Sequence, residues 1–341
     1  MLPPLELLRD LSNEFGFSGV GVTSFDSLDK DFNNYKNWID SGYHASMDYL
    51  ERGLEKRANL ESVFPECKSV LIFSSNYNPI VSEKSDVPRS ARYSVWPDYH
   101  KVIPKKIKQL MKKFSENLGT EIKYKVVVDT APVLERAIAV KSGIGFIGKN
   151  TNCISPQYGS WFFLAEVGVN ISLPSTSSIQ RDCGDCNLCI EHCPTGALVE
   201  PYKLDAGKCL SYLTIEYKGF IPEKYYSLMG NRIFGCDKCQ EICPYNKKDS
   251  IKTFLGELPL IPDAVISLND IWECDTDEKF RNRFQNSPIK RAGRMGLWRN
   301  AAIVAGNINH IESIPILKRI LNNESDEGLC SASAWALKNM S

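Results

Sequence analysis

The chain has 341 residues, 43% of them hydrophobic, which is enough for two or three domains with a sizeable core. Its 41 basic residues balance 41 acidic residues, and this neutrality excludes a strong overall attraction to nucleic acid or to a membrane surface. The first residues lack the layout of a signal peptide and no long apolar run occurs, so we expect a cytoplasmic protein without a membrane partner. Twelve cysteines in such a protein indicate metal or redox chemistry.

Residues 1–170 alternate helical and strand patterns, which predicts an α/β domain. Segment 5–15 has the apolar spacing of an amphipathic helix. Segments 18–25, 69–77 and 123–130 are rich in valine and other strand-forming residues, and they are predicted to be strands of one sheet.

Eight cysteines are concentrated in residues 171–250, a loop-rich segment that we predict to be a ferredoxin-like domain. The first run has the spacing C-x2-C-x2-C-x3-C-P, and the second has C-x2-C-x3-C-P, with the single Cys209 in place of its missing first cysteine. In bacterial two-cluster ferredoxins the last cysteine of each run ligates the other cluster. Structural zinc sites also use C-x2-C pairs, but they rarely continue with a third cysteine and x3-Cys-Pro. The spacing therefore predicts two 4Fe-4S clusters, one held by Cys183, Cys186, Cys189 and Cys243 and the other by Cys193, Cys209, Cys236 and Cys239.

Residues 251–341 are predicted to form a small α-helical domain, with helices at 297–308, 313–323 and 328–340. A weak internal similarity indicates a HEAT-like repeat, and a plain helical cap on the ferredoxin part is the alternative. Residues 279–311 contain seven lysines or arginines and no acid. This asymmetry favours contact with a polyanion over a plain basic surface.

Several long segments together resemble the epoxyqueuosine reductase family, and the resemblance covers nearly the whole chain. They include GYHASMDYL, ARYSVWPDYH, VDTAPVLERAIAVKSGIGFIGKNTN and SPIKRAGRMGLWRNAAIVAGN. The resemblance implies an α/β cobalamin-binding domain and reduction of epoxyqueuosine to queuosine at the wobble position of tRNA. It also implies that the two clusters pass electrons to cobalamin. We accordingly expect a monomer that contacts the anticodon stem-loop and receives electrons from an external low-potential donor.

The resemblance also implies site residues. Asp129 follows an apolar strand, its family counterpart is the proton donor, and burial is expected to raise its pKa; a helix N-cap is the alternative role. His100 is not expected to ligate cobalt, because Ile103 stands where the DxHxxG cobalamin signature requires glycine. The expected cobalamin contacts are Arg57, Tyr93, Asp129, Cys153, Ser155, Ser211 and Asp237. The expected substrate and tRNA contacts are Asp98, His100, Arg136, Lys290, Arg291, Arg294 and Arg299.

Two other functions are compatible with paired clusters. A reductive dehalogenase-like enzyme would use cobalamin and clusters on a small organohalide, but the basic tail disfavours it. A ferredoxin-type electron carrier would not need the large α/β segment 1–170.

Overall fold

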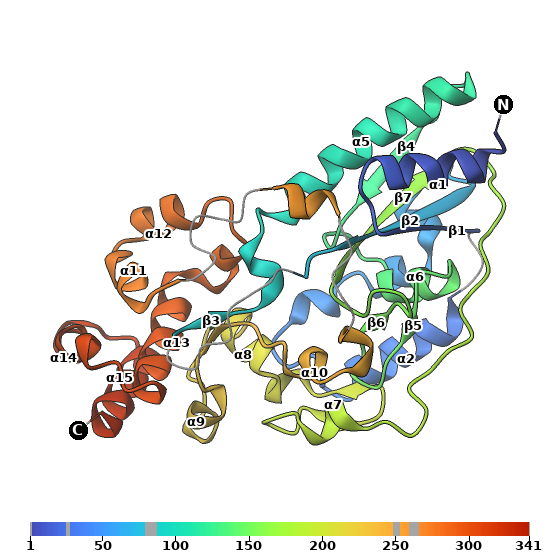
Figure 1. Ribbon diagram of the computed structural model, residues 1–341. Coiled ribbons are helices and arrows are strands. Elements are labelled where there is room, and N and C mark those ends of the chain that lie inside the picture. The colour runs from blue at the N-terminus through green and yellow to red at the C-terminus, as the bar shows by residue number, and fades with distance from the viewer. Residues whose placement is uncertain (1, 25–27, 79–86, 248–252, 259–265, 341) are drawn as a thin grey trace.

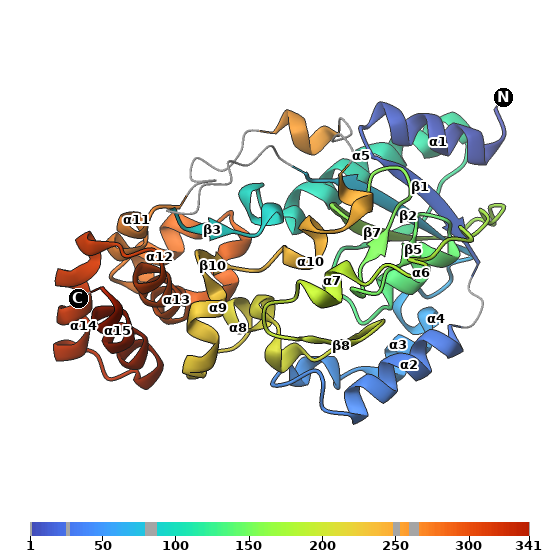
Figure 2. The same cartoon turned by 60° about the horizontal axis from the view of Figure 1, so that its bottom comes forward.

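The computed structural model describes residues 2–24, 28–78, 87–247, 253–258 and 266–340. An α/β layer lies at the end that carries the N-terminus, and a group of helices lies at the opposite end with the C-terminus (Figure 1). The cysteine-rich segment lies between and beside them, as the turned view shows (Figure 2). No helix within the described ranges is both long and apolar enough to cross a membrane.

One antiparallel sheet organises the α/β layer, with the strand order β1-β2-β7-β4. The three predicted strands are confirmed, and the central strand β7 was not among them. Strand β2 is buried along its whole length, as expected for an inner strand. The bounds are β1 (Gly19–Thr23), β2 (Ser69–Asn76), β4 (Tyr124–Val127) and β7 (Phe162–Val169).

Helices cover both faces of this sheet. Helices α1 (Pro4–Glu14) and α5 (Tyr99–Leu118) pack their apolar sides on one face, where Leu8 and Ile107 are fully buried. Helix α6 (Glu135–Lys141) packs on the other face through Ile138 and its neighbours. Shorter helices complete this layer: α2 (Asp29–Asp40), α3 (Leu54–Ala58) and α4 (Leu60–Val63).

Short elements dominate the cysteine-rich region. The stretch 174–196 contains no buried side chain, although every residue in it is described. Strand β3 pairs in parallel with β10, which joins the segment before α5 to the cysteine-rich region. The elements are β3 (Arg89–Ser90), β5 (Phe146–Ile147), β6 (Cys153–Ile154), α7 (Leu188–Glu191), β8 (Leu198–Glu200), β9 (Lys203–Leu204), α8 (Leu210–Ile215), α9 (Tyr226–Met229), β10 (Arg232–Phe234) and α10 (Lys238–Glu241).

The C-terminal helices surround α13, whose central residues are almost all buried. The three helices predicted in this part of the chain are confirmed. The bounds are α11 (Leu268–Glu273), α12 (Asp277–Phe284), α13 (Gly293–Asn307), α14 (Ile314–Asn323) and α15 (Glu327–Asn339). Single-turn 3-10 helices connect the elements of the whole chain: η1 (Asp48–Leu50), η2 (Arg92–Val95), η3 (Ala206–Lys208), η4 (Glu223–Tyr225), η5 (Pro244–Asn246), η6 (Phe254–Glu257), η7 (Pro288–Ala292) and η8 (Ile311–Ser313).

Packing crosses both predicted domain boundaries. Phe254 and Leu255 are buried in the core of the α/β layer, and the Phe254 amide donates to the carbonyl of Gly16. Helix α13 shares one core with α8, α9 and β10. The hydrophobic cores therefore extend across the predicted boundaries. The division into domains 1–170, 171–250 and 251–341 stays a prediction.

Candidate active site

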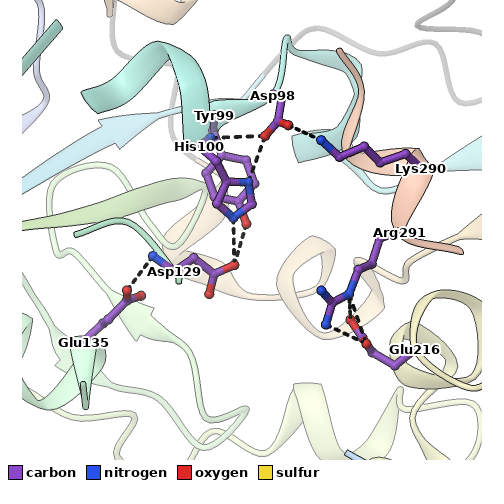
Figure 3. A network of polar contacts seen from close by, with 8 residues as sticks. All are labelled: Asp98, Tyr99, His100, Asp129, Glu135, Glu216, Lys290 and Arg291. Carbon is purple, nitrogen blue, oxygen red and sulfur yellow. Dashed lines mark hydrogen bonds and ion pairs between the residues drawn. The ribbon is translucent and has the colours of Figure 1, made fainter. Parts of the chain in front are cut away.

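The N-terminus of α5 presents two ring side chains to the site. Asp98 caps this helix, because its Oδ1 accepts the backbone N–H of His100 at 3.2 Å and lies 2.8 Å from His100 Nδ1. Tyr99 stacks between His100 and Phe163, with ring centroids 4.0 and 4.1 Å away. These contacts fix Tyr99 and His100 on the side of α5 that faces Asp129 (Figure 3).

Asp129 lies in the loop that follows β4, and both its carboxylate and its backbone N–H make polar contacts. Tyr99 Oη donates to Asp129 Oδ2 at 2.6 Å, and His100 Nε2 lies 3.5 Å from the same oxygen. The backbone N–H of Asp129 donates to Glu135 Oε1 at 2.7 Å. The φ of Asp129 is +55°, a left-handed conformation that is unfavourable for a residue other than glycine. Since α6 starts at Glu135 with Leu134 as its N-cap, Asp129 does not cap that helix.

The charges around His100 decide its protonation. Burial alone would raise the pKa of Asp129, but hydrogen bonds from His100 and Tyr99 and the positive charges of His100 and Arg291 lower it. The expected rise in the pKa of Asp129 is therefore wrong. Burial would lower the pKa of His100, yet its two carboxylate neighbours raise it to about 9. A hydrogen bond from His100 is the main reason that the pKa of Asp98 is low. At neutral pH an imidazolium thus lies between two carboxylates.

A second ion pair, between Arg291 and Glu216, lies opposite Asp129 (Figure 3). Arg291 on η7 donates two hydrogen bonds to the carboxylate of Glu216, which follows α8. Its Nε lies 2.9 Å from Oε1 and its Nη2 lies 3.0 Å from Oε2. This two-pronged geometry holds the guanidinium firmly, and the group also lies over the ring of Tyr49 at 5.5 Å. Lys290, the neighbour of Arg291, donates to Asp98 Oδ2 at 2.7 Å. The site is therefore bounded by α5, the loop after β4, α8 and η7.

The basic tail is less available to a polyanion than its sequence indicated. Arg299 is only 2% exposed, and its guanidinium donates to the carbonyls of Leu213, Tyr217 and Gly219, so its assignment as a tRNA contact is wrong. Arg294 is largely covered as well. Acids from outside the acid-free stretch pair with its cations, and these pairs are Lys279–Asp275, Arg283–Asp270, Lys290–Asp98, Arg291–Glu216 and Arg294–Asp277. Lys290 and Arg291 keep about half of their side chains exposed, at 47% and 56%.

The structure gathers the four cysteines of one predicted set, and the assignment of ligands to both sets stays a prediction. The thiols of Cys183, Cys186, Cys189 and Cys243 line a single pocket. Burial, followed by the neighbouring thiols of its set, raises the pKa of Cys189 to about 11. In the other set, burial followed by the neighbouring thiols of Cys209 and Cys236 raises the pKa of Cys239.

The two sets lie next to each other. Helix α7 contacts α10, and the thiol of Cys189 lies close enough to Cys239 to raise its pKa. Neighbouring cysteine sets suit single-electron transfer between the clusters they would hold. Within the described ranges, no three His, Cys, Asp or Glu side chains converge on a point where one ion could bind. Cys183, Cys186, Cys189 and Cys243 instead line one pocket, as a cluster requires.

Of the residues expected to bind cobalamin, Tyr93, Asp129 and Asp237 lie near one another. Burial, followed by the charges of Asp237, Asp129 and Glu216, raises the pKa of Tyr93. Its ring lies 6.3 Å from the ring of Tyr99, on the side of the acid site. Asp237 accepts the Arg92 N–H at 2.8 Å, and burial raises its pKa to about 6.

The remaining expected cobalamin contacts supply polar groups at the edges of the site. Arg57 donates to the Val133 carbonyl at 3.3 Å, while its buried Nε has no partner among the described residues. Ser211 is partly exposed in the first turn of α8. The unpartnered Arg57 Nε–H fits a ligand with many amide carbonyls, such as the side chains of the corrin ring of cobalamin.

Three other expected residues lie on the α6 side. Cys153 and Ser155 are both buried, and the Ser155 Oγ accepts the Gln157 N–H at 3.2 Å. Arg136 is exposed and donates to the Thr151 carbonyl. These contacts hold the loop between β5 and β6 in place beside α6.

Sequence reasoning missed Tyr99, Glu135 and Glu216. Tyr99 stands between two residues that were assigned to the site, and the capped start of α5 was a signal that it shares their direction. Glu135 and Glu216 gave no local signal, because their partners Asp129 and Arg291 become neighbours only through folding.

Comparisons with known proteins agree with this arrangement. Residues 57–130 match the family model "Epoxyqueuosine reductase QueG, DUF1730", and residues 182–246 match "4Fe-4S double cluster binding domain". The chain is 37% identical to an epoxyqueuosine reductase of Pseudomonas aeruginosa, over 92% of this chain and 87% of that protein.

Solved structures of such enzymes share the fold. An epoxyqueuosine reductase crystallised with an epoxyqueuosine-modified tRNA stem-loop has a TM-score of 0.87 and 29% identity, over 98% of this chain and 90% of that chain. The Bacillus subtilis epoxyqueuosine reductase, in a structure with its catalytic aspartate loop swung out of the active site, has a TM-score of 0.86 and 28% identity over the same shares.

Proposed function

Because the chain belongs to the epoxyqueuosine reductase family, we propose that it reduces epoxyqueuosine to queuosine at the wobble position of tRNA. The observation that carries this proposal is the contact of His100 Nε2 with Asp129 Oδ2 at 3.5 Å. On the other side of Tyr99 lies the ring of Tyr93, and the N–H of the preceding Arg92 donates to Asp237, which follows the cluster cysteine Cys236. A proton source and an electron source thus meet in one place.

The reaction removes the epoxide oxygen as water and leaves an alkene, so it consumes two electrons and two protons. The two clusters, when bound, would supply electrons one at a time. Bound cobalamin would supply a reduced, nucleophilic cobalt for the attack on carbon. We propose that Arg57, Tyr93, Cys153, Ser155, Ser211 and Asp237 hold it, and the unpartnered Arg57 Nε supports this assignment.

Asp129 is proposed to deliver a proton to the leaving oxygen. Its carboxylate is ionised at neutral pH, so the proton must first reach Oδ2 from the imidazolium at His100 Nε2, 3.5 Å away. Tyr99 Oη orients the same oxygen. The catalytic aspartate of the Bacillus subtilis relative also lies on a loop at the active site. We therefore describe Asp129 and His100 as one proton-donating pair.

Lys290 and Arg291 are the proposed contacts to tRNA phosphates. Both lie at the rim of the site and are about half exposed, unlike Arg299. Phosphate contacts would fix the position of the stem-loop, and the modified base would enter the space between Arg291 and Asp129. A relative crystallised with an epoxyqueuosine-modified tRNA stem-loop supports tRNA as the partner.

The direct test is anaerobic incubation of the reconstituted protein with cobalamin, a strong reductant and tRNA bearing epoxyqueuosine. Mass analysis of the nucleosides should show conversion to queuosine. Unchanged epoxyqueuosine, in protein with both clusters present, would remove the proposed function.

A further inference from the structure

A buried acid lies behind the active-site loop and takes no part in the chemistry described above. Glu166 is on the central strand β7, where it pairs with Ile72 of β2 and Val127 of β4, and its exposure is 0%. Neither carboxyl oxygen has a hydrogen-bond donor among the described residues. An ionised carboxylate in such a place would be very costly, so Glu166 must carry a proton.

The group that faces Glu166 is Glu135, in the first turn of α6. Burial and the Glu135 carboxyl hold the pKa of Glu166 well above its ordinary range. Burial, and then the charge of Asp129, raise the pKa of Glu135 to about 7. The protonated Glu166 can donate its O–H to Glu135, whose Oε1 already accepts the Asp129 N–H.

We propose that Glu135 and Glu166 share a proton and, through the Asp129 amide, hold the loop that keeps the Asp129 carboxylate against His100 and Tyr99. Glu135 and Glu166 are positioning residues, since neither contacts the reacting atoms. This role deepens the proposed function and rests on it. The left-handed φ of Asp129 is unfavourable, so the loop would leave this backbone conformation if the Glu135 carboxyl did not accept the Asp129 N–H.

Few other charges face the pair. Arg136 follows Glu135 on α6, and Asp129 lies at the end of the β4 segment. Lys125 is further along β4 on the same face, but its ammonium donates to the Val63 carbonyl at 2.8 Å. On β2 the residue paired with Glu166 is Ile72, and the hydroxyl of Ser74, two residues further on, lies 2.7 Å from Tyr158 Oη. The Asp129 amide and the Glu166 proton are therefore the donors on which Glu135 depends.

The test measures the loop directly, by amide hydrogen exchange of segment 128–134 in the full chain purified anaerobically with its clusters. Glu135→Ala should speed exchange of the Asp129 amide at least about tenfold, because its acceptor is gone. Glu135→Gln should retain protection, since its carbonyl oxygen can still accept. Glu121→Ala is the matched control, an exposed glutamate just before β4.

Substitutions of Glu166 distinguish two possible roles of this side chain, donation of a hydrogen bond to Glu135 and simple filling of the space. Glu166→Gln keeps a donor toward Glu135 and should keep the slow exchange, whereas Glu166→Met has similar length without a donor and should speed exchange several-fold. In turnover assays Glu135→Ala should lower kcat with little change in KM. Equal exchange in the Gln and Met variants, or unchanged exchange in Glu135→Ala, would overturn the proposal. A wild type that makes no queuosine would instead remove the proposed function and leave the exchange result standing.

Discussion

His100 carries its charge because two carboxylates compete for it. Asp98 is 3% exposed and holds Nδ1, while Asp129 is near Nε2. The arrangement makes the imidazolium a proton reservoir for Asp129, and the pair titrates as a unit. The chemistry of the site thus depends on residues from two different elements, the start of α5 and the loop after β4.

Replacement of Asp129 by asparagine tests the acid role. Asp129→Asn keeps the size and the Tyr99 contact but removes the charge, so turnover should fall by about 100-fold or more while both clusters remain. NMR titration should show the pKa of His100 falling from about 9 toward its ordinary 6.5, because one anionic partner is lost. Asp10→Asn, at an exposed position of α1, is the control. Full activity in Asp129→Asn would contradict the role.

The same charges predict a pH dependence of stability. The folded pKa of His100 is raised from 6.5 to about 9, so its contribution is complete below pH 6.5 and is lost as the pH rises through 9. The lowered pKa of Asp98 acts in the opposite direction, with a contribution that is lost as the pH falls below 3.8.

The His100→Gln variant isolates the histidine contribution. Its apparent Tm should lie below that of the wild type at pH 6.5, and the gap should shrink by pH 9. Because the ring is partly exposed, the gap should correspond to on the order of 1–2 kcal/mol, or a few degrees. A gap that is constant across this range would show that His100 is not charged by its neighbours.

Helix α13 anchors the loop that carries Glu216. Arg299 Nη2 donates to the Leu213 carbonyl at 2.8 Å, and Asn300 Nδ2 donates to the carbonyls of Thr214 and Ile233 at 2.8 and 2.9 Å. These side chains satisfy backbone groups at the end of α8 that would otherwise be buried without partners. One face of a C-terminal helix therefore holds part of the active site.

Substitution of Arg299 should affect folding rather than RNA affinity. Arg299→Met leaves three carbonyls unsatisfied and should destabilise the protein by about 2–4 kcal/mol, seen as a lower apparent Tm. The dependence of tRNA binding on salt should not change at temperatures where the variant is folded. A normal Tm together with weakened RNA binding would restore the phosphate role.

The lone Cys209 tests the exchange of ligands between the cysteine runs. Cys209 lies just before α8, outside both runs. Cys209→Ser should therefore lower iron content and remove one of two cluster signals by electron paramagnetic resonance, while the cluster of Cys183 and its set remains. Cys274→Ser is the control, since Cys274 is buried in the C-terminal core. Loss of both clusters at once would argue against separate sets.

At the scale of the whole molecule, η7 joins the helical end to the α/β layer through Lys290 and Asp98. If Lys290 and Arg291 also meet phosphates, each contact should contribute about one unit to the slope of log affinity against log salt. Arg291→Ala should weaken tRNA binding and reduce that slope by about 1. Lys318→Ala, on α14, should leave the slope unchanged. Identical slopes in the wild type and Arg291→Ala would place the RNA elsewhere.

The sequence predicted those parts of the molecule that local patterns encode. Cysteine spacing predicted the thiol set that lines one pocket, and apolar periodicity specified three strands and the C-terminal helices. Strand β7 was missed because Glu166 interrupts its apolar run. Two predictions failed for one reason: that Arg299 contacts tRNA, and that the pKa of Asp129 is raised. Both depend on tertiary contacts, namely the burial of Arg299 and the approach of His100 to Asp129. The monomeric state, the electron donor and the cytoplasmic location stay predictions.

The stretch 174–196 has no side chain in any core, yet it contributes four cysteines. With so little apolar burial, its ordering must come from the iron-sulfur cubes themselves, in the way that small metal-dependent modules acquire shape only on loading. Cluster insertion is then a step in the folding of this stretch. After oxygen destroys the clusters, proteases should cleave this stretch before they cleave the sheet.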